Sequence, residues 1–389
     1  MRKANYDIII IGGGVMGSST AYHLMKHDNL NVAVIERDPT YARASTPLSI
    51  GNLRIQFNLK ENVQISQYAF KFFENFEEEM AVAGARPRIS WHQEGNLFIQ
   101  DEENRERAEA EMVMQQNLGC EVEWWSAETL AERLPHCNLD GYIGATYGPR
   151  DGTMDPYAVL MGFKAKARSL GADYINDEAT EICKKSGSVT GVKLASGTKL
   201  RSGIVLNCAG AWAAEIAKTA GVDIPVAPVK RQVFAVDPQF KQDTLPRLTV
   251  LPSGLYIAQE AGGILFVSKT LADDPVGFNF NWEEKRFMDV IWPEAAEFNP
   301  QLETLKLIRG WAGLYAENTL DANAVLGEWP ELKGFYLANG FSGHGFQQAA
   351  AVGRHMSELM TGRQPSLDLS IFGPERVMEN KPIRANVVV

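Results

Sequence analysis

A glycine-rich turn between a buried strand and a helix is the feature that most restricts how this chain can fold. Asp7–Ile11 is a short, continuous apolar run, as expected of a strand buried on both faces of a parallel sheet. The residues that follow read GGGVMG, which matches G-x-G-x-x-G, and a helix is predicted over Ser18–Lys26. A second apolar run, Asn31–Ile35, ends in Glu36. This order of strand, glycine turn, helix, strand and acid predicts a Rossmann-type dinucleotide-binding unit.

Each glycine of the turn has its own physical purpose. Gly12 permits the tight turn, Gly14 lets the backbone approach a pyrophosphate, and Gly17 lets the helix pack close to the strand. The helix N-terminus directs free N–H groups and a positive dipole end toward the phosphates. Glu36 can accept hydrogen bonds from both ribose hydroxyls, and its charge would repel a 2′-phosphate. The turn therefore predicts a dinucleotide other than NADP, with NAD and FAD both open.

A second glycine-rich turn near the other end of the chain favours a flavin. Gly334–Ala338 has the composition of a buried strand, Asn339–Phe346 contains three glycines, and Gln347–Met360 is predicted to be a helix that Gly362 stops. A second turn suits an extended cofactor whose far end needs its own binding loop. A helix N-terminus aimed at the flavin ring would stabilise the negative charge that develops on reduction. A tightly packed ordinary loop is the alternative interpretation.

The overall composition excludes several classes of protein. The chain has 389 residues, of which 38 are Lys or Arg and 48 are Asp or Glu, so its formal charge is −10. Because it has no basic block, nucleic acid and anionic membranes are not expected partners. No apolar run reaches the roughly 18 residues of a membrane helix, and the run before the glycine turn is too short for a signal peptide. We therefore expect a cytoplasmic protein of two or three domains.

The cysteines and histidines are dispersed along the chain. The four cysteines are Cys120, Cys137, Cys183 and Cys208, and no C-x-x-C pair or zinc-spaced histidine pair is present. We therefore expect free thiols in a reducing compartment and no metal site.

Several motifs together resemble a known enzyme family. Four segments carry the resemblance, in the order found in the family: Ile10–Gly17, Asp151–Pro156, Asn207–Trp212 and Gly340–Gln347. They are similar to the D-amino-acid oxidase/sarcosine oxidase superfamily of FAD-dependent oxidoreductases, over Tyr6 to Phe372. Within it, Ala44–Ile50, Arg309–Tyr315 and Phe341–Gln348 most resemble one branch. That branch contains a mitochondrial FAD-dependent oxidoreductase-domain protein, linked to complex I assembly, and its bacterial relatives.

The resemblance implies an α/β Rossmann-type FAD domain and a discontinuous substrate domain built on an antiparallel sheet. We expect residues 1–82, 140–228 and 320–372 in the FAD domain, residues 83–139 and 229–319 in the substrate domain, and 373–389 as a C-terminal tail without periodicity. Composition predicts strands at Ile89–Gln100, Val189–Leu194, Lys199–Arg201, Gly203–Asn207, Arg231–Val236, Leu255–Gln259 and Ile264–Ser268. A helix is predicted over Met154–Leu170, with Asp155 as N-cap and Pro156 in its first turn.

The resemblance also assigns residues to the cofactor. The ADP half would be held by Gly12, Gly14, Val15, Met16, Gly17 and Glu36, and the ribose and phosphates by Arg37, Ser45, Thr46 and Ser49. Ala179 and Gly210 would line the adenosine side, and Gly313, Gly343, His344, Gly345, Phe346 and Gln347 would surround the flavin ring.

The family's reaction is the removal of hydride from a carbon that bears an amine. The hydride passes to flavin N5 and the product is an imine, so the protein mainly positions the substrate and tunes the flavin. The resemblance therefore implies an amine or amino-acid substrate, with a secondary or N-alkyl amine expected. The candidate catalytic residues are Tyr315, His344, Gln347, Tyr256 and Arg54.

Two departures from the family affect the flavin. The cysteine that attaches flavin covalently in some members is replaced by Gly313, so FAD is expected to be non-covalent. The lysine that speeds the reaction with oxygen falls near Leu265, and Lys269 is expected at the end of that strand. Without a cation beneath the flavin, slow use of oxygen and a different electron acceptor are expected. Oxidase and dehydrogenase both stay open.

A third departure affects the carboxylate of the substrate. Gln347 stands where sarcosine oxidases have a lysine, and Phe57 where they have an arginine. The carboxylate could instead be bound through Arg54, Arg309 or Tyr256, with a solvated strand end as the alternative for Arg309. Because the usual carboxylate-binding residues are absent, a second hypothesis stays open, namely a flavoprotein whose main role is assembly or partner binding. The sequence leaves a homo-oligomer open.

Overall fold

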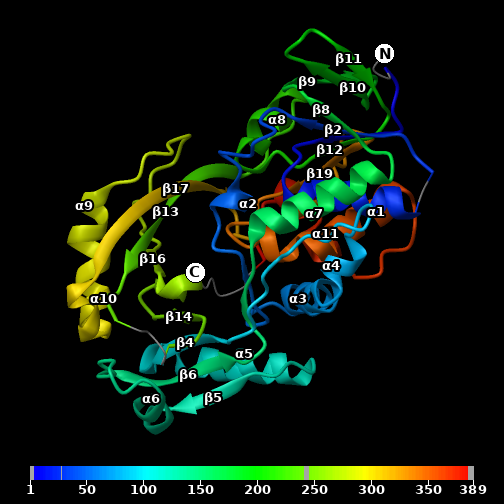
Figure 1. Cartoon of the computed structure of the whole chain (residues 1–389). Helices are drawn as coiled ribbons and strands as arrows, with labels where there is room; N and C mark the ends of the chain where they lie inside the picture. The colour runs from blue at the N-terminus through cyan, green and yellow to red at the C-terminus, as the bar shows by residue number, and fades with distance from the viewer. Residues whose placement is uncertain (1–3, 28, 241–244, 384–389) are drawn as a thin grey trace.

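The computed structural model describes residues 4–27, 29–240 and 245–383 and consists of two halves, each built on one large sheet (Figure 1). The first sheet has the strand order β18-β19-β12-β1-β2-β8. Its strands are β1 (Ile8–Ile11), β2 (Val32–Glu36), β8 (Asp173–Asn176), β12 (Val205–Asn207), β18 (Val325–Glu328) and β19 (Phe335–Asn339). All neighbours are parallel except β18 and β19. This is the doubly covered parallel sheet expected of a dinucleotide-binding domain.

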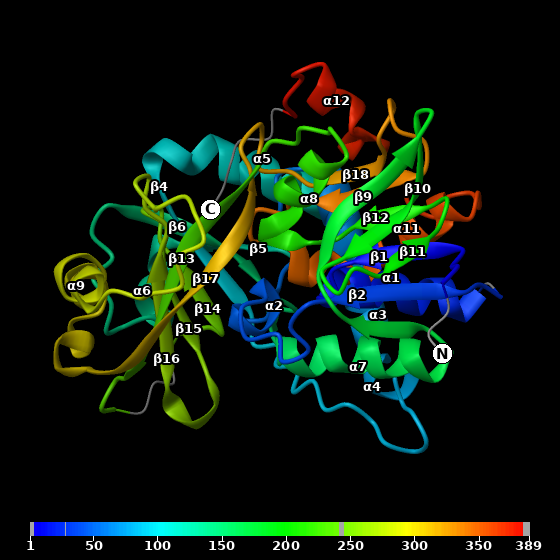
Figure 2. The ribbon, with the colours of Figure 1, turned by 90° about the horizontal axis from the view of Figure 1, so that it is seen from above.

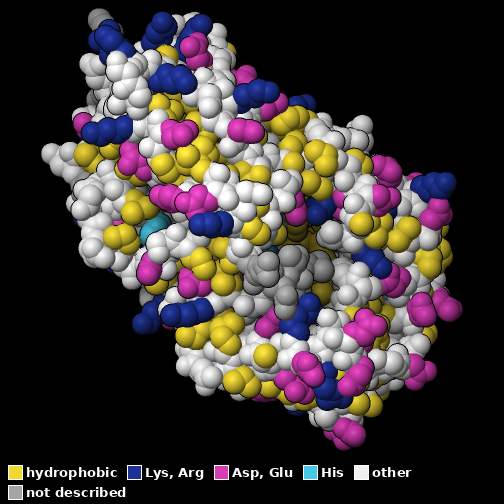
Figure 3. All heavy atoms as spheres, turned by 180° about the vertical axis from the view of Figure 1, so that it is seen from behind, with side chains coloured by type: hydrophobic (Ala, Val, Ile, Leu, Met, Phe, Trp, Pro, Cys, Tyr) yellow, Lys and Arg dark blue, Asp and Glu magenta, His cyan; other side chains and the backbone are white. Residues whose placement is uncertain are grey.

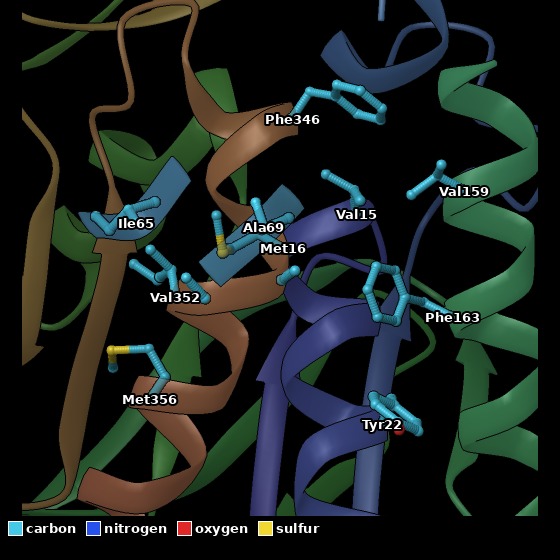
Figure 4. Close-up of a cluster of buried hydrophobic side chains, with 14 of the residues drawn as sticks. Val15, Met16, Tyr22, Ile65, Ala69, Val159, Phe163, Phe346, Val352 and Met356 are labelled. Atoms are coloured by element: carbon cyan, nitrogen blue, oxygen red, sulfur yellow. The ribbon is translucent and has the colours of Figure 1, made fainter. Parts of the chain in front are cut away.

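Helices cover one face of this sheet. They are α1 (Val15–His27), α3 (Lys60–Phe73), α4 (Phe76–Glu79), α7 (Pro156–Ser169) and α11 (Gly345–Met360). Figure 4 shows α1 between α11 and α7, with Val15 and Met16 near Phe346 and Tyr22 near Phe163. The opposite face packs on a three-stranded sheet of β9 (Ala179–Lys185), β10 (Ser188–Leu194) and β11 (Lys199–Arg201), and on α8 (Ala213–Thr219). Because both faces are buried, the central strand β1 and all of β2 before Glu36 are apolar without alternation.

The second sheet has the order β17-β13-β16-β15-β14-β4-β6-β5. Its strands are β4 (Asn96–Asp101), β5 (Glu123–Ser126), β6 (Tyr142–Gly148), β13 (Val226–Asp237), β14 (Leu248–Val250), β15 (Leu255–Gln259), β16 (Leu265–Lys269) and β17 (Lys306–Asn318). Only the pair β14 and β4 is parallel among its described strands. Figure 2 shows this sheet beside the first half, with β13 and β17 reaching toward α2 (Ser45–Leu48).

The two faces of the second sheet have different roles. One face packs on the helices α6 (Ala127–Arg133) and α10 (Trp292–Phe298) in a closed apolar core. The other face carries a small apolar cluster of Phe98, Leu248, Val250 and Ala258. The second face is therefore available to form one wall of a cavity.

The remaining α-helices and β-strands are β3 (Asn52–Leu53), β7 (Gly152–Thr153), α5 (Arg105–Asn117), α9 (Glu284–Arg286) and α12 (Glu375–Met378).

The distribution of charged side chains on the surface agrees with a composition that is acidic overall but contains both signs of charge. On the face drawn in Figure 3, acidic and basic side chains are interspersed rather than gathered by sign. No helix in the described part of the chain is both long and apolar enough to span a bilayer. The four cysteines are free thiols.

Most of the predicted elements form, and three expectations need correction. The strand expected over Ile89–Gln100 is confined to β4, because Ser90 and Gly95 adopt positive φ angles that interrupt extended backbone. The domain boundary expected at residue 140 is displaced, because β6 pairs with β4 and β5 up to Gly148. The other expected boundaries stay predictions.

The segment after Phe372, expected to be a separate tail without periodicity, is partly docked on the rest of the molecule. It contains the short helix α12, and the buried guanidinium of Arg376 donates to the carboxylate of Asp321 at 2.7 Å. The same guanidinium donates to the backbone carbonyls of Asn323 and Ala324. These long-range contacts could not be inferred from periodicity.

Candidate functional site

A cavity of about 380 Å³ lies between the two halves of the molecule. In the first half it reaches Glu36, at the end of β2, and Ala179, at the start of β9. In the second half it reaches Val250 on β14 and Tyr256 on β15. Every residue predicted to bind the cofactor or to act in catalysis, except Gly17, lines this one cavity. Residues far apart in the sequence are therefore brought to one elongated site.

The three glycines of the first turn occupy the positions that their spacing predicted. Gly12 has φ +96°, and a Cβ atom there would overlap the carbonyl of Cys208. A Cβ atom on Gly17 would overlap the carbonyl of Gly12, so this glycine lets α1 pack closely on the turn. A Cβ atom on Gly14 would meet no protein atom within 4 Å, and Gly14 borders the cavity. Backbone there is open to a close-lying ligand.

Glu36 and Tyr41 present polar groups at this end of the cavity. The Glu36 carboxylate accepts hydrogen bonds from the backbone N–H groups of Gly13 and Asp38, each at 2.8 Å. Each carboxylate oxygen keeps a second acceptor site, which can receive a hydroxyl. Burial raises the pKa of Glu36. The Tyr41 hydroxyl is buried with no hydrogen-bond partner among the described residues, as a group left for a ligand would be.

The residues predicted beside the phosphates are tied into the fold. The Ser45 hydroxyl donates to the carbonyl of Leu314 at 2.7 Å, which fastens α2 to β17. The Ser49 hydroxyl donates to the carbonyl of Thr46 at 2.8 Å. The Arg37 guanidinium lies 3.9 Å from the ring centroid of Trp212. These side chains border the cavity with their positions already fixed by protein contacts.

The second glycine turn forms the opposite part of the cavity. Gly343 has φ +92°, and a Cβ atom there would overlap the ring of Tyr315 on β17. The helix α11 begins at Gly345, with His344 as its N-cap residue. Its first N–H groups have no partner within the helix and lie where the turn borders the cavity. Gly313 faces α2, because a Cβ atom there would lie 3.2 Å from the Cβ atom of Leu48.

Arg54 is the most unusual group of the site. Arg54 is only 8% exposed, and the Cζ atom of its guanidinium lies 4.6 Å from the ring centroid of Phe57 and 5.2 Å from that of Phe98. The Nη2 atom lies 3.2 Å from Nε2 of His344, and the backbone N–H donates to Oε1 of Gln347 at 2.9 Å. Burial lowers the pKa of Arg54, which forms no ion pair with any described residue. An unpaired buried charge is destabilising until a ligand neutralises it.

The contacts of Arg54 define the roles open to its two neighbours. A guanidinium only donates hydrogen bonds, so Nε2 of His344 accepts and its proton is carried on Nδ1. Burial, with the neighbouring Arg54, lowers the pKa of His344 to about 3, so its ring is neutral at physiological pH. Gln347, a predicted catalytic residue, lines the cavity and uses its side-chain carbonyl to hold the backbone of Arg54.

A buried carboxylate holds the segment that follows Arg54. Asp151 is fully buried and accepts from the backbone N–H of Ile55 at 2.8 Å and from the side chain of Gln56 at 3.0 Å. Burial raises its pKa to about 7. Asp151 therefore contributes to the position of the segment beside Arg54 from behind the cavity.

Two tyrosines and a second arginine complete the wall formed by the antiparallel sheet. Tyr256 and Tyr315 both line the cavity, and burial raises the pKa of each phenol. Arg231, which the sequence reasoning missed, lies 5.0 Å from the ring centroid of Tyr315 and pairs with Asp274 at 2.8 Å and Glu317 at 3.4 Å. Its signal in the sequence was weak, because Lys230 and Gln232 flank it in the same strand.

The structure also shows where the other positions considered for a flavin-side or substrate-binding cation lie relative to the cavity. Leu265 is buried in the core on the far face of the sheet, and Lys269 is paired with Glu294 at 2.6 Å. Among the described residues, no lysine lines the cavity. Arg309 is exposed, lies over Trp311, and does not border the cavity, so the suggestion that it binds the substrate is wrong. Arg54 and Tyr256 are the alternatives that remain.

Comparisons with known proteins agree with this geometry. A family model described as DAO, FAD dependent oxidoreductase, matches residues 7–359. The bovine FAD-dependent oxidoreductase domain-containing protein 1 is 36% identical over 409 residues, which cover 94% of this chain and 83% of that protein. Human mitochondrial dimethylglycine dehydrogenase is 28% identical over 96% of this chain, which spans 44% of that protein. The crystal structure of L-proline dehydrogenase from P. horikoshii superposes with a TM-score of 0.88 at 27% identity, covering 98% of this chain and 100% of that one.

Proposed function

The chain belongs to the DAO family of FAD-dependent oxidoreductases, and we propose that it oxidises the carbon–nitrogen bond of a secondary or N-alkyl amino acid. FAD is its cofactor. The observation that carries the proposal is Arg54, a buried cation without an acid partner in the wall of the cavity. The names of two relatives add support, because proline and dimethylglycine both have an alkylated nitrogen near a carboxylate.

The residues of the cavity suit the two ends of FAD. The ADP half fits the turn at Gly12–Gly17, where Gly14 leaves open space and Glu36 can accept from ribose hydroxyls. The flavin ring fits against the wall formed by the turn at Gly343–Gln347 and by Tyr315, which packs on Gly343. The free N–H groups and the positive dipole end of α11 favour negative charge there. FAD held by these residues would supply the acceptor for the hydride that leaves the carbon beside the amine.

Arg54 is the proposed partner of the substrate carboxylate. A carboxylate within reach would form charge-assisted hydrogen bonds and remove the penalty of an unpaired buried cation. The neutral His344 accepts from Nη2 and thereby sets the plane of the guanidinium. Gln347 holds the backbone of Arg54. We therefore assign a positioning role to His344 and Gln347 rather than direct action on the substrate.

The surroundings favour the neutral amine from which hydride leaves readily. Phe98, Leu248 and Val250 form an apolar wall of the cavity, and burial in such a wall disfavours an ammonium ion. The positive charge of Arg54 acts in the same direction. Tyr256 and Tyr315 keep their protons because burial raises their pKa, so each can exchange a hydrogen bond with the amine or the carboxylate. No separate base is required.

We further propose that the reduced enzyme reacts slowly with oxygen and uses another electron acceptor. Two cavity cations lie close enough to Tyr315 to act on its phenol, Arg231 and Arg54: Arg231 is paired with carboxylates, and Arg54 would be neutralised by the substrate. Little free positive charge then remains to stabilise a superoxide-like anion. The cytoplasmic location inferred from composition stays a prediction, which fractionation of the native cells would check.

The test is an anaerobic titration of the purified yellow protein, followed by flavin absorbance. The panel contains sarcosine, other N-alkyl amino acids, cyclic imino acids and primary D- and L-amino acids. We expect bleaching by an alkylated amine and slow recovery of colour when air is admitted. If dithionite reduces the flavin but no amine does, the amine reaction is wrong and a partner-binding flavoprotein becomes the better hypothesis.

A further inference from the structure

A second, smaller cavity adjoins the main one at Arg54. It has a volume of about 70 Å³ and is called here the α5 chamber, because Arg107 and Glu111 of α5 form its outer end. Its wall shares three residues with the main cavity, namely Arg54, Phe98 and His344. The side chains of Arg107 and Glu111 are 30% and 23% exposed, so the chamber runs from the protein surface to the inner guanidinium.

The charged groups of the chamber do not balance one another. Arg107 reaches Glu111 only at 3.9 Å, and its Nε atom is buried without a hydrogen-bond partner among the described residues. Arg54 forms no ion pair with any described residue. Asp321, which also borders the chamber, is already paired with Arg376 at 2.7 Å. Two guanidinium groups therefore share one available carboxylate, that of Glu111.

The remaining polar groups are held by the protein and cannot supply the missing negative charge. The side-chain amide of Gln115 donates to the carbonyl of Phe57 at 2.8 Å, and that of Gln100 donates to the carbonyl of Phe98 at 3.1 Å. Burial raises the pKa of Glu111, and Arg107 and Arg54 oppose that shift, so Glu111 is only a weakly stabilised anion. The chamber is thus a small, polar, electropositive recess with fixed walls.

We propose that the α5 chamber is a carboxylate-binding subsite, bounded by the guanidinium groups of Arg54 and Arg107. A volume of this size holds a few water molecules or one carboxylate with its methylene group. The inference rests on the proposed function in assigning that group to the substrate. The substrate would then be an N-alkyl amino acid with two carboxylates. One carboxylate lies near the oxidised carbon and the second reaches past Arg54 toward Arg107.

The experiment compares ligands with one and two carboxylates on the holoenzyme. N-methylalanine and N-methylaspartate are titrated anaerobically, and dissociation constants are taken from the change in flavin absorbance. We expect N-methylaspartate to bind at least about tenfold more tightly. In Arg107→Gln this ratio should fall by about tenfold, the effect of losing a charged hydrogen-bond donor. Arg107→Lys should keep a larger part of the ratio.

A matched control comes from the same helix. Arg105 is an exposed neighbour that pairs with Glu102 and Glu109, and Arg105→Gln should leave the ratio unchanged. A parallel titration with acetate identifies the source of the carboxylate. If acetate binds in a manner that requires Arg107 while N-methylaspartate has no advantage, the chamber holds a free carboxylate rather than part of the substrate.

The outcomes separate this inference from the proposed function. If neither N-methylaspartate nor acetate responds to Arg107→Gln, the subsite does not exist. If the ratio depends on Arg107 although no amine bleaches the flavin, the subsite stands and amine oxidation is wrong. If amines bleach the flavin with no preference that Arg107 controls and no acetate binding there, the reaction stands and the subsite is wrong.

Discussion

Replacing Arg54 with methionine should separate ligand binding from stability. The variant keeps a long apolar side chain between Phe57 and Phe98 but removes the charge. It loses the contact with His344, about 1 kcal/mol, and two cation–π contacts of about 0.5–2 kcal/mol each. It also removes the desolvation penalty of an unpaired buried ion, several kcal/mol in general. The net free energy of unfolding should therefore stay within about 1 kcal/mol of the parent or rise.

A second buried arginine of the same cavity supplies the comparison. Arg231 pairs with Asp274 and Glu317, and the side chain of Asp274 is 2% exposed. Arg231→Met leaves these carboxylates with less compensation, although Arg286 still pairs with Asp274. Breaking a buried ion pair costs about 3–5 kcal/mol, and the remaining partner reduces the loss here to roughly 2–4 kcal/mol. The same substitution should thus have opposite consequences at two arginines.

Two assays check this comparison. Urea unfolding in excess FAD, followed by tryptophan fluorescence, measures stability. Titration of the flavin spectrum with the best amino-acid ligand measures affinity, which Arg54→Met should lower by about 10- to 150-fold for a loss of 1.5–3 kcal/mol. The reasoning is refuted if Arg54→Met destabilises the protein as much as Arg231→Met, or if the affinity for a carboxylate ligand is unchanged.

Three further predictions follow from particular groups. Gly14→Ala should weaken FAD binding, because the added methyl group fills space that the cofactor would occupy, but it should leave the unfolding midpoint of the apoprotein near that of the parent. Gly17→Ala should lower the midpoint, because the added methyl group would overlap the carbonyl of Gly12. Burial lowers the pKa of His23 to about 3, so the native state stays neutral while the unfolded chain takes up a proton below pH 6.5. The contribution of His23 to stability should fall by about 1.4 kcal/mol per unit as pH decreases from 6.5 toward 3, and His23→Leu should change the pH slope of the whole protein by that amount. Because Gly313 replaces the attachment cysteine, acid precipitation should leave all FAD in the supernatant.

Each of these has a clear contrary result. Equal loss of FAD affinity and of stability in both glycine variants would contradict the division of roles between Gly14 and Gly17. An unchanged pH slope of the urea midpoint in His23→Leu would show that other groups control the acid response. Yellow colour in the acid pellet would show a covalent link at a residue other than position 313.

Local signals account for the parts of the fold that the sequence predicted well. The first turn was readable because Gly12 and Gly17 each avoid overlap with a nearby carbonyl, while Gly14 leaves open space beside the cavity. The helix α7 was readable because Asp155 accepts from the N–H groups of Tyr157 and Ala158, with Pro156 in the first turn. Such contacts depend on neighbours in the chain, and their residue types are specific to them.

Signals that depend on distant partners were weaker. The strand β17 was not predicted, although its residues were recognised as a motif. Its buried face carries Gly310, Ala312, Leu314 and Ala316, so small residues conceal the alternation that marks a strand. Pairing with β13 along its length makes it a strand, and β13 lies about seventy residues earlier in the chain.

The sequence by itself determined the cofactor class, because two strand–turn–helix units carry their own geometry in their glycines. Only the tertiary structure decided which cation lines the cavity. Arg54 and Arg309 were equivalent candidates by residue type, but β17 turns Arg309 to the surface, while contacts from Phe57, Phe98 and His344 enclose Arg54. A side chain's electrostatic role depends on burial and on which charges are absent around it. Both depend on contacts between segments that are far apart in the sequence, and a local sequence pattern contains no information about such contacts.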